Sequence, residues 1–138
     1  MIIDCTKIAE AFFTFNYLYF DNILPEPYFK IRHGFNILGY FRYELGAPFG
    51  ETETIEITDF YDYTINQFRD ILVHEMIHYY LYYIGEDTKL RHGKAFKKMA
   101  RQLNDEFHLD IRVHPDTSKM KPRRNAPFFT RLLYDLFN

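Results

Sequence analysis

The stretch TINQFRDILVHEMIHYYLYYIG, residues 64–85, is the part of the sequence from which the fold is best inferred. Its first four residues have the S/T-x-x-Q form of a capping box, in which Thr64 and Gln67 satisfy the backbone at the start of a helix. Its last residue, Gly85, is of the type that commonly follows the end of a helix. Apolar residues fall on nearly all sides of the segment between them, which predicts a central, buried helix of about five turns.

This predicted helix contains an H-E-x-x-H pattern, His74-Glu75-Met76-Ile77-His78. Histidines at positions i and i+4 project from successive turns of one helix face, so both imidazoles can bind one zinc ion while Glu75 flanks the metal-bound water. In a chain of this composition, with 6 histidines in 138 residues, the number of matches to this pattern expected by chance is roughly 0.02. The alternative is a pair of core histidines hydrogen-bonded to tyrosines or carboxylates. Burying two imidazoles and a carboxylate together is costly without a metal, which favours the zinc interpretation.

A catalytic zinc site needs a third protein ligand and an open position for water. His92 is the best candidate, because it comes 14 residues after His78 at the start of a second helical pattern, and Gly93 lets the backbone come close. The apolar stripe of that second helix consists of Phe96, Met99, Ala100, Leu103 and Phe107. The alternative third ligands are Glu106, Asp105, His108 and His114.

Asp70, one turn before His74, is a candidate hydrogen-bond acceptor for a metal ligand. An acidic residue at this place also simply favours the first half of a helix, so the functional interpretation competes with a structural one.

The composition is that of a single globular domain. A domain typically has about 150 residues, so a chain of 138 residues has the length of one domain. Its content of 47% hydrophobic and 26% charged residues excludes a disordered or fibrous chain. One cysteine, Cys5, forms neither an internal disulfide nor a four-cysteine zinc ribbon, so a metal must be bound by His, Asp or Glu. The net charge of -2 argues against a strongly basic nucleic-acid binder. Without a positively charged leader or a bilayer-length apolar run, we expect a cytoplasmic protein with no membrane contact.

Working outward from the central helix, the sequence predicts an α+β domain over residues 1–114. A first amphipathic helix spans Asp4–Phe20, and two short strands, Phe29–His33 and Ile37–Tyr43, suit a hairpin or meander that stops at the Gly46-Ala47-Pro48 turn. The segment Thr54–Thr58 alternates like a strand with one wet and one dry face. It is a candidate edge to which an extended substrate can add by backbone pairing, or else an ordinary edge strand.

After this domain, residues 115–127 are predicted to be an exposed connector and residues 128–138 a C-terminal helix. The apolar stripe of that helix consists of Phe128, Phe129, Leu132, Leu133 and Leu136. The stripe either docks on the domain or serves as a partner-binding or dimer element.

The stretch His74–His78, followed by His92-Gly93-Lys94-Ala95-Phe96, resembles the SprT-like metalloprotease domain, the family of bacterial SprT proteins and eukaryotic Spartan. Upstream, Tyr19–Pro25 resembles the family's F-x-x-x-L-P entry, and Leu38-Gly39-Tyr40-Phe41 with Ile55-Glu56-Ile57 resembles its strands. The resemblance covers roughly residues 17–107.

This resemblance implies a zincin-like minimal metalloprotease domain, in which a small antiparallel or mixed sheet packs on the central helix. It implies His74, His78 and His92 as ligands of one zinc ion and Glu75 as the catalytic glutamate. Eukaryotic members cut proteins crosslinked to DNA. The four-cysteine ribbon of many members cannot form here, which weakens the transfer of that substrate.

Two groups of basic residues are candidate nucleic-acid contacts. Lys94, Lys97, Lys98 and Arg101 form a stripe opposite the apolar face of the second helix, and Lys119, Lys121, Arg123, Arg124 and Arg131 form another group. A solvated helix face is the alternative explanation of the stripe.

The sequence therefore predicts a zinc-dependent endopeptidase that acts on protein or peptide substrates, with DNA-associated proteins as one candidate class. In this mechanism Glu75 takes the proton of a zinc-activated water and delivers it to the leaving amine. The oxyanion-stabilising residue stays unassigned among Tyr40, Tyr43, Tyr61 and Tyr63. The alternative functions are a non-catalytic zinc- or nucleic-acid-binding module and another type of zinc hydrolase.

Overall fold

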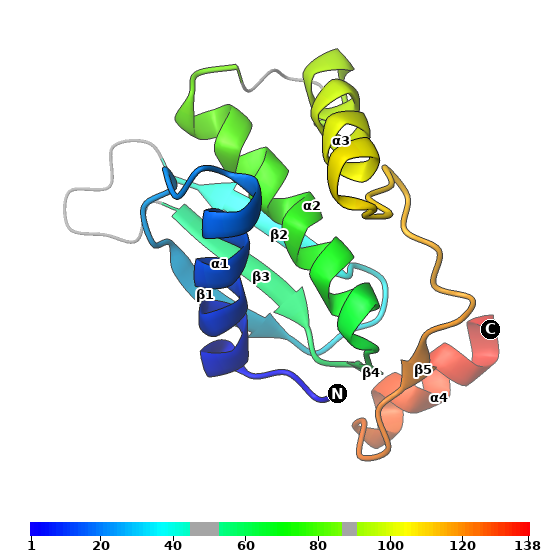
Figure 1. Ribbon diagram of the computed structural model, residues 1–138. Helices are drawn as coiled ribbons and strands as arrows, with labels where there is room; N and C mark the ends of the chain where they lie inside the picture. The colour runs from blue at the N-terminus through cyan, green and yellow to red at the C-terminus, as the bar shows by residue number, and fades with distance from the viewer. Residues whose placement is uncertain (45–52, 87–90) are drawn as a thin grey trace.

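The computed structural model describes residues 1–44, 53–86 and 91–138, and the predicted turn at Gly46-Ala47-Pro48 lies outside these ranges. The described residues form a mixed α+β structure (Figure 1). Its helices are α1 (Cys5–Tyr19), α2 (Ile65–Tyr83), α3 (Lys94–Phe107) and α4 (Phe128–Phe137). Its strands are β1 (Tyr28–Arg32), β2 (Gly39–Tyr43), β3 (Glu53–Thr58), β4 (Tyr61–Asp62) and β5 (Lys121–Pro122). None of these helices is both long enough and apolar enough to cross a membrane.

The main sheet is mixed, with the strand order β1-β3-β2. β1 runs parallel to β3 and β2 runs antiparallel to it, so the predicted hairpin between the first two strands is wrong. The physical reason lies in burial: Ile55 and Ile57 of β3 are fully buried, and a strand this apolar is most stable with a neighbour on each side. The chain between β1 and β2 therefore passes β3 instead of turning back on itself.

α1 and α2 cover one face of this sheet side by side (Figure 1). The aromatic rings of Phe12 from α1 and Phe41 from β2 pack on Tyr79 of α2, with ring centroids 6.4 Å and 5.2 Å away. The Tyr79 hydroxyl donates a hydrogen bond to the carbonyl of Pro25 at 2.8 Å, so its polar end is also satisfied. The core thus lies between the sheet and the two helices.

The opposite face of β3 is also buried, although the alternation in the sequence predicted a wet face. Glu56 is only 7% exposed, and its carboxylate lies 2.8 Å from Arg32 and 3.4 Å from Arg42 on the flanking strands. The long arginine side chains cover β3 while their charged ends pair with Glu56, which is why a polar pattern here does not mean exposure.

The central helix agrees with its prediction. Thr64 and Gln67 form both hydrogen bonds of the capping box, at 2.9 Å and 3.1 Å. At the other end, Gly85 has φ +78° and its N–H bonds the Tyr82 carbonyl at 3.1 Å. The nine residues from Ile71 to Tyr79 are all buried. Tyr83, the last residue of α2, is 50% exposed.

The segment after α3 returns along the start of α2 and is more structured than a plain connector. Asn104 of α3 holds it through two hydrogen bonds to the backbone of Ile111, and Met120 is buried. β5 within it pairs with β4.

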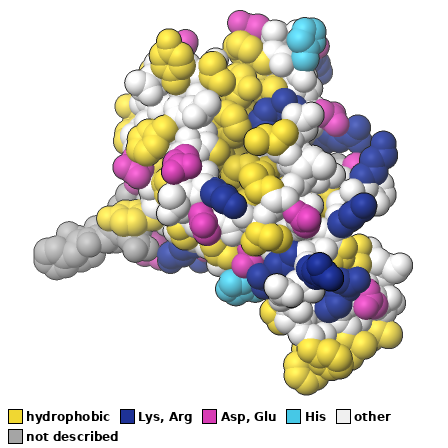
Figure 2. Space-filling model, turned by 60° about the horizontal axis from the view of Figure 1, so that its bottom comes forward, with side chains coloured by type: hydrophobic (Ala, Val, Ile, Leu, Met, Phe, Trp, Pro, Cys, Tyr) yellow, Lys and Arg dark blue, Asp and Glu magenta, His cyan; other side chains and the backbone are white. Residues whose placement is uncertain are grey.

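α4 contacts the rest of the described structure through the ring of Tyr134. Tyr134 packs on Phe35, Phe60 and Tyr61, with centroid distances of 5.6, 5.2 and 6.2 Å. The predicted docking stripe (Phe128, Phe129, Leu132, Leu133 and Leu136) is instead 45–76% exposed. Figure 2 shows apolar side chains gathered at the lower end of the view, where α4 lies.

Candidate metal centre

Three histidine side chains converge at the side of α2 that faces α3. His74 and His78 project from successive turns of α2, and His92 comes from the turn just before α3. The Nε2 atom of His92 lies 3.1 Å from Nε2 of His74 and 3.2 Å from Nε2 of His78. One ligand atom from each of the three lies within 4.8 Å of the others. The structure therefore brings together the three histidines that the sequence selected.

These spacings fit a zinc ion. Zinc binds imidazole nitrogen at about 2.0–2.1 Å in tetrahedral geometry, so two histidine ligands on one ion place their nitrogens about 3.3 Å apart. The two observed spacings of 3.1 Å and 3.2 Å are close to this value. Among the described residues, Glu106, Asp105, His108 and His114 lie outside the group that can share an ion.

The orientation of His74 is set by the backbone. Its Nδ1 lies 2.8 Å from the carbonyl oxygen of Arg112, which only accepts hydrogen bonds, so Nδ1 carries the proton and Nε2 presents its lone pair to the other histidines. The sequence suggested Asp70 as a hydrogen-bond acceptor for a metal ligand. At His74 Nδ1 the acceptor is the Arg112 carbonyl. The Asp70 carboxylate accepts a hydrogen bond from Nε of the adjacent Arg69 at 2.9 Å.

Phe96 supports all three imidazoles from one side. Its ring, 1% exposed, has its centroid 4.8 Å from that of His74, 4.7 Å from His78 and 4.9 Å from His92. From the sequence, Phe96 was placed in the apolar stripe of α3 and in the stretch that resembles the SprT-like domain, and it was assigned no role at the site. Its position one helical turn after His92 was the available signal that it also packs against the ligands.

Burial keeps the histidines of α2 neutral. Desolvation, with a smaller contribution from the neighbouring imidazoles, lowers the pKa of His74 to about 4 and that of His78 to about 3. Desolvation also lowers the pKa of His92. Neutral imidazoles are the form that binds a metal, so all three side chains are ready to act as ligands near neutral pH.

Glu75 lies between the two histidines in sequence and is 3% exposed. Burial raises the pKa of its carboxyl to about 8, and the nearby Arg91 guanidinium opposes this rise. A cation held by the histidines favours the ionised carboxylate further, since opposite charges stabilise each other at short range. Glu75 is thus a carboxyl group whose proton affinity suits proton transfer near neutral pH.

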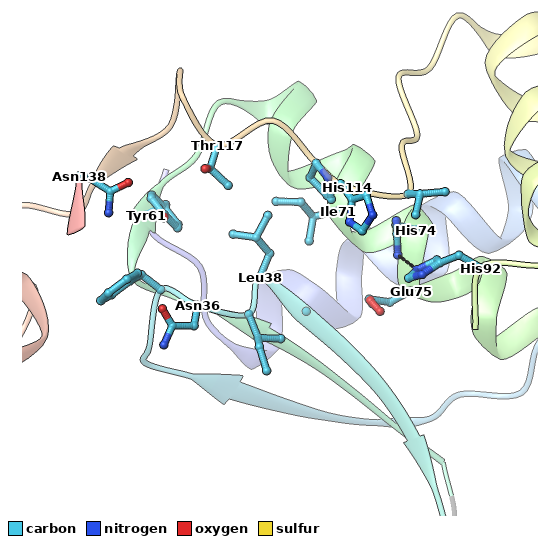
Figure 3. A pocket seen from close by; sticks show the side chains of 15 residues that line it. Asn36, Leu38, Tyr61, Ile71, His74, Glu75, His92, His114, Thr117 and Asn138 are labelled. Atoms are coloured by element: carbon cyan, nitrogen blue, oxygen red, sulfur yellow. Dashed lines mark hydrogen bonds between the residues drawn. The ribbon is translucent and has the colours of Figure 1, made fainter. Parts of the chain in front are cut away.

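Glu75, His74 and His92 line a cleft with a volume of about 530 Å³. Figure 3 shows that its two walls come from distant parts of the chain: Asn36 and Leu38 lie on one side, and His114 and Thr117 on the other. Gly39 lies so close to Glu75 that a Cβ atom there would be 3.0 Å from Glu75 Cγ. The carboxyl group therefore faces an open space while its stem is tightly packed.

The edge strand next to this cleft is β2. The sequence proposed Thr54–Thr58 as the edge for substrate pairing, but β3 has neighbours on both sides, so that prediction is wrong. Among the described strands, β2 lies at the edge beside Glu75. The Thr58 N–H donates to the Leu38 carbonyl at 2.8 Å, and the alternation of an antiparallel pair then directs the backbone groups of Gly39 and Phe41 away from β3.

The four tyrosines considered for oxyanion stabilisation occupy different surroundings. Tyr61 lines the cleft, and its pKa is raised to about 12 by burial. The hydroxyl of Tyr63 is engaged with the Thr58 carbonyl at 2.7 Å. Tyr40 stacks under the Arg91 guanidinium, 4.3 Å from the ring centroid, and Tyr43 stacks on Tyr82 at 4.2 Å. No pattern in the sequence singled out Arg91, which directly precedes His92.

The basic stripe of α3 is exposed along its whole length, at Lys94, Lys97, Lys98 and Arg101. These four side chains lie on the helix face opposite the buried Phe96, Ala100 and Leu103.

The family model of the SprT-like family matches residues 8–118, which include β1 to β3, α2, α3 and all three histidines. No curated protein matches the chain. The match covers most of the 138 residues and the whole of the histidine cluster with Glu75. The chain therefore belongs to the SprT-like family, and its fold is a metalloprotease-type domain.

Proposed function

We propose that this protein is a zinc-dependent endopeptidase with a zincin-like site. The observation that carries the proposal is the position of Glu75, which lines an open cleft beside three convergent imidazoles. A zinc site that serves only stability has closed coordination and no use for a carboxyl group beside an open position.

Each residue of the site has a role that follows from its surroundings. His74, His78 and His92 hold the zinc ion through their neutral nitrogens. Zinc, when bound, supplies Lewis acidity that lowers the pKa of water to about 7 and polarises a carbonyl group. Glu75 accepts the water proton on its carboxylate and then delivers this proton to the leaving amine. The Arg112 carbonyl and the Phe96 ring keep the imidazoles in position meanwhile.

The edge of β2 offers a place for the substrate backbone. The outward backbone groups of Gly39 and Phe41 can pair with an extended peptide, in the manner of strand addition to a sheet edge. Gly39 touches the stem of Glu75, so a peptide paired here passes directly beside the catalytic carboxyl group.

The experiment compares three proteins by zinc content and peptide cleavage. Wild type should bind one zinc ion per chain and cleave an unfolded protein such as casein. Glu75→Gln should keep its zinc and lose cleavage, because the ligands stay intact while the proton acceptor is removed. His92→Ala should lose zinc, since two histidines alone hold the ion far less tightly. Full zinc content without cleavage in wild type would contradict the enzyme and favour a non-catalytic zinc-binding module.

DNA-associated proteins are the substrate class that we propose to test first. The supporting observation is the exposed stripe of Lys94, Lys97, Lys98 and Arg101, whose charges are free to reach a phosphate backbone. Lys97→Glu with Lys98→Glu should weaken binding to labelled single-stranded DNA and make its loss with rising salt shallower than in wild type, because fewer phosphates are neutralised. DNA binding that is equal in wild type and variant would contradict this contact.

A further inference from the structure

The cleft beside Glu75 continues away from the histidines, over α2, to Tyr61 (Figure 3). Its floor is Ile71, one turn before Glu75 on α2. Ile37 and Leu38 line one wall and Val113 lines the other. Among the described residues that line it, Glu75 is the only acidic side chain and none is lysine or arginine.

Apolar side chains in this cleft are open to solvent. Ile37 is 42% exposed, and Leu38 and Val113 are each partly exposed. Single exposed apolar residues are ordinary on protein surfaces, but several that line one concave space mark a binding site for an apolar group. A volume of about 530 Å³ lies within the usual range of ligand sites and exceeds one side chain.

The occupant follows from what the cleft adjoins. Its inner end is Glu75 and His74, so whatever fills it lies next to the bond that the proposed enzyme cleaves. The cleft is also lined by Gly39 of β2, whose outward backbone groups suit an extended chain. An acidic side chain would lose its hydration here without meeting a lysine or arginine among the described lining residues, whereas an aromatic or branched aliphatic side chain would remove Ile37 and Leu38 from water.

We propose that this cleft is a specificity subsite that selects extended polypeptide segments with a bulky apolar side chain close to the cleaved bond. The proposal rests on the proposed peptidase function and deepens it, since it names the class of segment that the site takes. Such side chains are buried in folded proteins, so the subsite favours unfolded or locally opened substrates.

The experiment uses quenched fluorescent peptides of one sequence, with Leu, Phe, Ala, Asp or Lys at a single position that is moved along the peptide. At one position, kcat/KM should be about tenfold higher for Leu or Phe than for Asp. Ile37→Ser should reduce this ratio several-fold. The matched control is Ile84→Ser, because Ile84 is 41% exposed, like Ile37, but lies at the end of α2 away from the cleft. Its ratio should equal that of wild type.

A second variant distinguishes a change in the subsite from loss of folding, because its preference for one peptide should increase. Ile37→Asp should raise kcat/KM for the Lys peptide relative to the Leu peptide, a change that loss of structure cannot produce. Cleavage that depends on Glu75 but shows no side-chain preference at any peptide position would contradict the subsite and would still support the peptidase function.

Binding separates failure of the subsite from failure of the peptidase. Fluorescence anisotropy with Glu75→Gln should show tighter binding of the Leu and Phe peptides than of the Asp peptide, and Ile37→Ser in that background should remove the difference. This result without cleavage by wild type would support the subsite and contradict the peptidase. Absence of both cleavage and selective binding would overturn both.

Discussion

Gly39→Ala is the substitution for which the structure makes the sharpest forecast. The added Cβ atom would lie 3.0 Å from Glu75 Cγ, 3.1 Å from Ile57 Cδ1 and 3.2 Å from the Glu56 carbonyl oxygen. Gly39 has no left-handed backbone conformation, so alanine is excluded by its neighbours and not by its own φ. The three neighbours surround the new methyl group, and movement away from Glu75 brings it closer to β3.

The size of the effect follows from these distances. Carbon atoms in contact are normally about 3.5–4.0 Å apart, so the stem of Glu75 must move by about 0.5 Å or more. Overpacking of this kind costs about 1–3 kcal/mol of stability, which corresponds to a fall in Tm of about 3–10 °C. Misplacement of a catalytic group by 1 Å costs about 100-fold in rate, so a shift of half that size should lower kcat by about tenfold.

The assay measures kcat on one quenched peptide, zinc per chain and Tm for each variant. Zinc content of Gly39→Ala should stay near that of wild type, because the three atoms nearest the new methyl group belong to Glu75, Ile57 and Glu56. Loss of rate with retained zinc is the signature of a displaced carboxyl group.

Gly34→Ala is the matched control for this test. No atom lies within 4 Å of a Cβ built on Gly34, and its backbone also avoids the left-handed region. It should therefore keep wild-type rate and stability. If Gly39→Ala retains the same kcat as Gly34→Ala, the argument that Gly39 positions Glu75 is refuted.

Three further predictions concern the carboxyl group, the first helix and the last one. Burial raises the pKa of Glu75 to about 8, from an ordinary value of 4.5. Between these two pH values the folded, metal-free protein keeps a proton that the unfolded chain releases. The free energy of unfolding therefore falls as pH rises from about 4.5 to about 8. In EDTA, Glu75→Gln should therefore have a higher Tm than wild type at pH 8 and an equal one near pH 4, and a constant difference would contradict this. Asn16 is 2% exposed, and its side-chain amide forms two hydrogen bonds with the backbone of Leu24, at 2.9 Å and 3.2 Å. Asn16→Ala should therefore lower the free energy of unfolding, measured in urea, by about 2–3 kcal/mol. A loss below about 0.5 kcal/mol, which is typical of exposed sites, would contradict a structural role for these hydrogen bonds. Tyr134→Ala should speed amide hydrogen exchange in residues 128–137 without lowering Tm by more than about 2 °C, and unchanged exchange would show that other contacts hold α4.

The central helix and the position of its two histidines were predictable because both depend on local sequence. The capping box at Thr64, the stop at Gly85 and the i, i+4 spacing of His74 and His78 are properties of consecutive residues. His92 was predictable as a neighbour because the helix after it has an apolar stripe that must pack on the core.

The order of the strands was not predictable from the same kind of pattern. Phe29–His33 and Ile37–Tyr43 are close in sequence and separated by a glycine, which favours a hairpin locally. The apolar strand β3 instead separates them, and its position depends on the burial of Ile55 and Ile57 against helices far away in the sequence. The edge strand was wrong for the same reason, because an edge is defined by partners that a single segment does not reveal.

The exposed stripe of α4 shows where periodicity reaches its limit. Five apolar residues at helical spacing predicted the helix correctly, but the ring that contacts the domain is Tyr134, between Leu133 and Asp135 on the other face. Periodicity identifies the more apolar face of a helix, and it does not tell which face meets the protein and which meets a partner.

The site itself depends on groups to which the motifs assigned no role. The carbonyl of Arg112 fixes the tautomer of His74, yet a backbone oxygen carries no side-chain signature, and its position follows only from the return of the chain along α2. Phe96 packs against all three imidazoles because α3 begins directly after His92, so one turn of helix carries both a ligand and its support. The spacing of the histidines thus predicts which side chains converge, whereas their orientation comes from core and backbone contacts that exist only once the chain has folded.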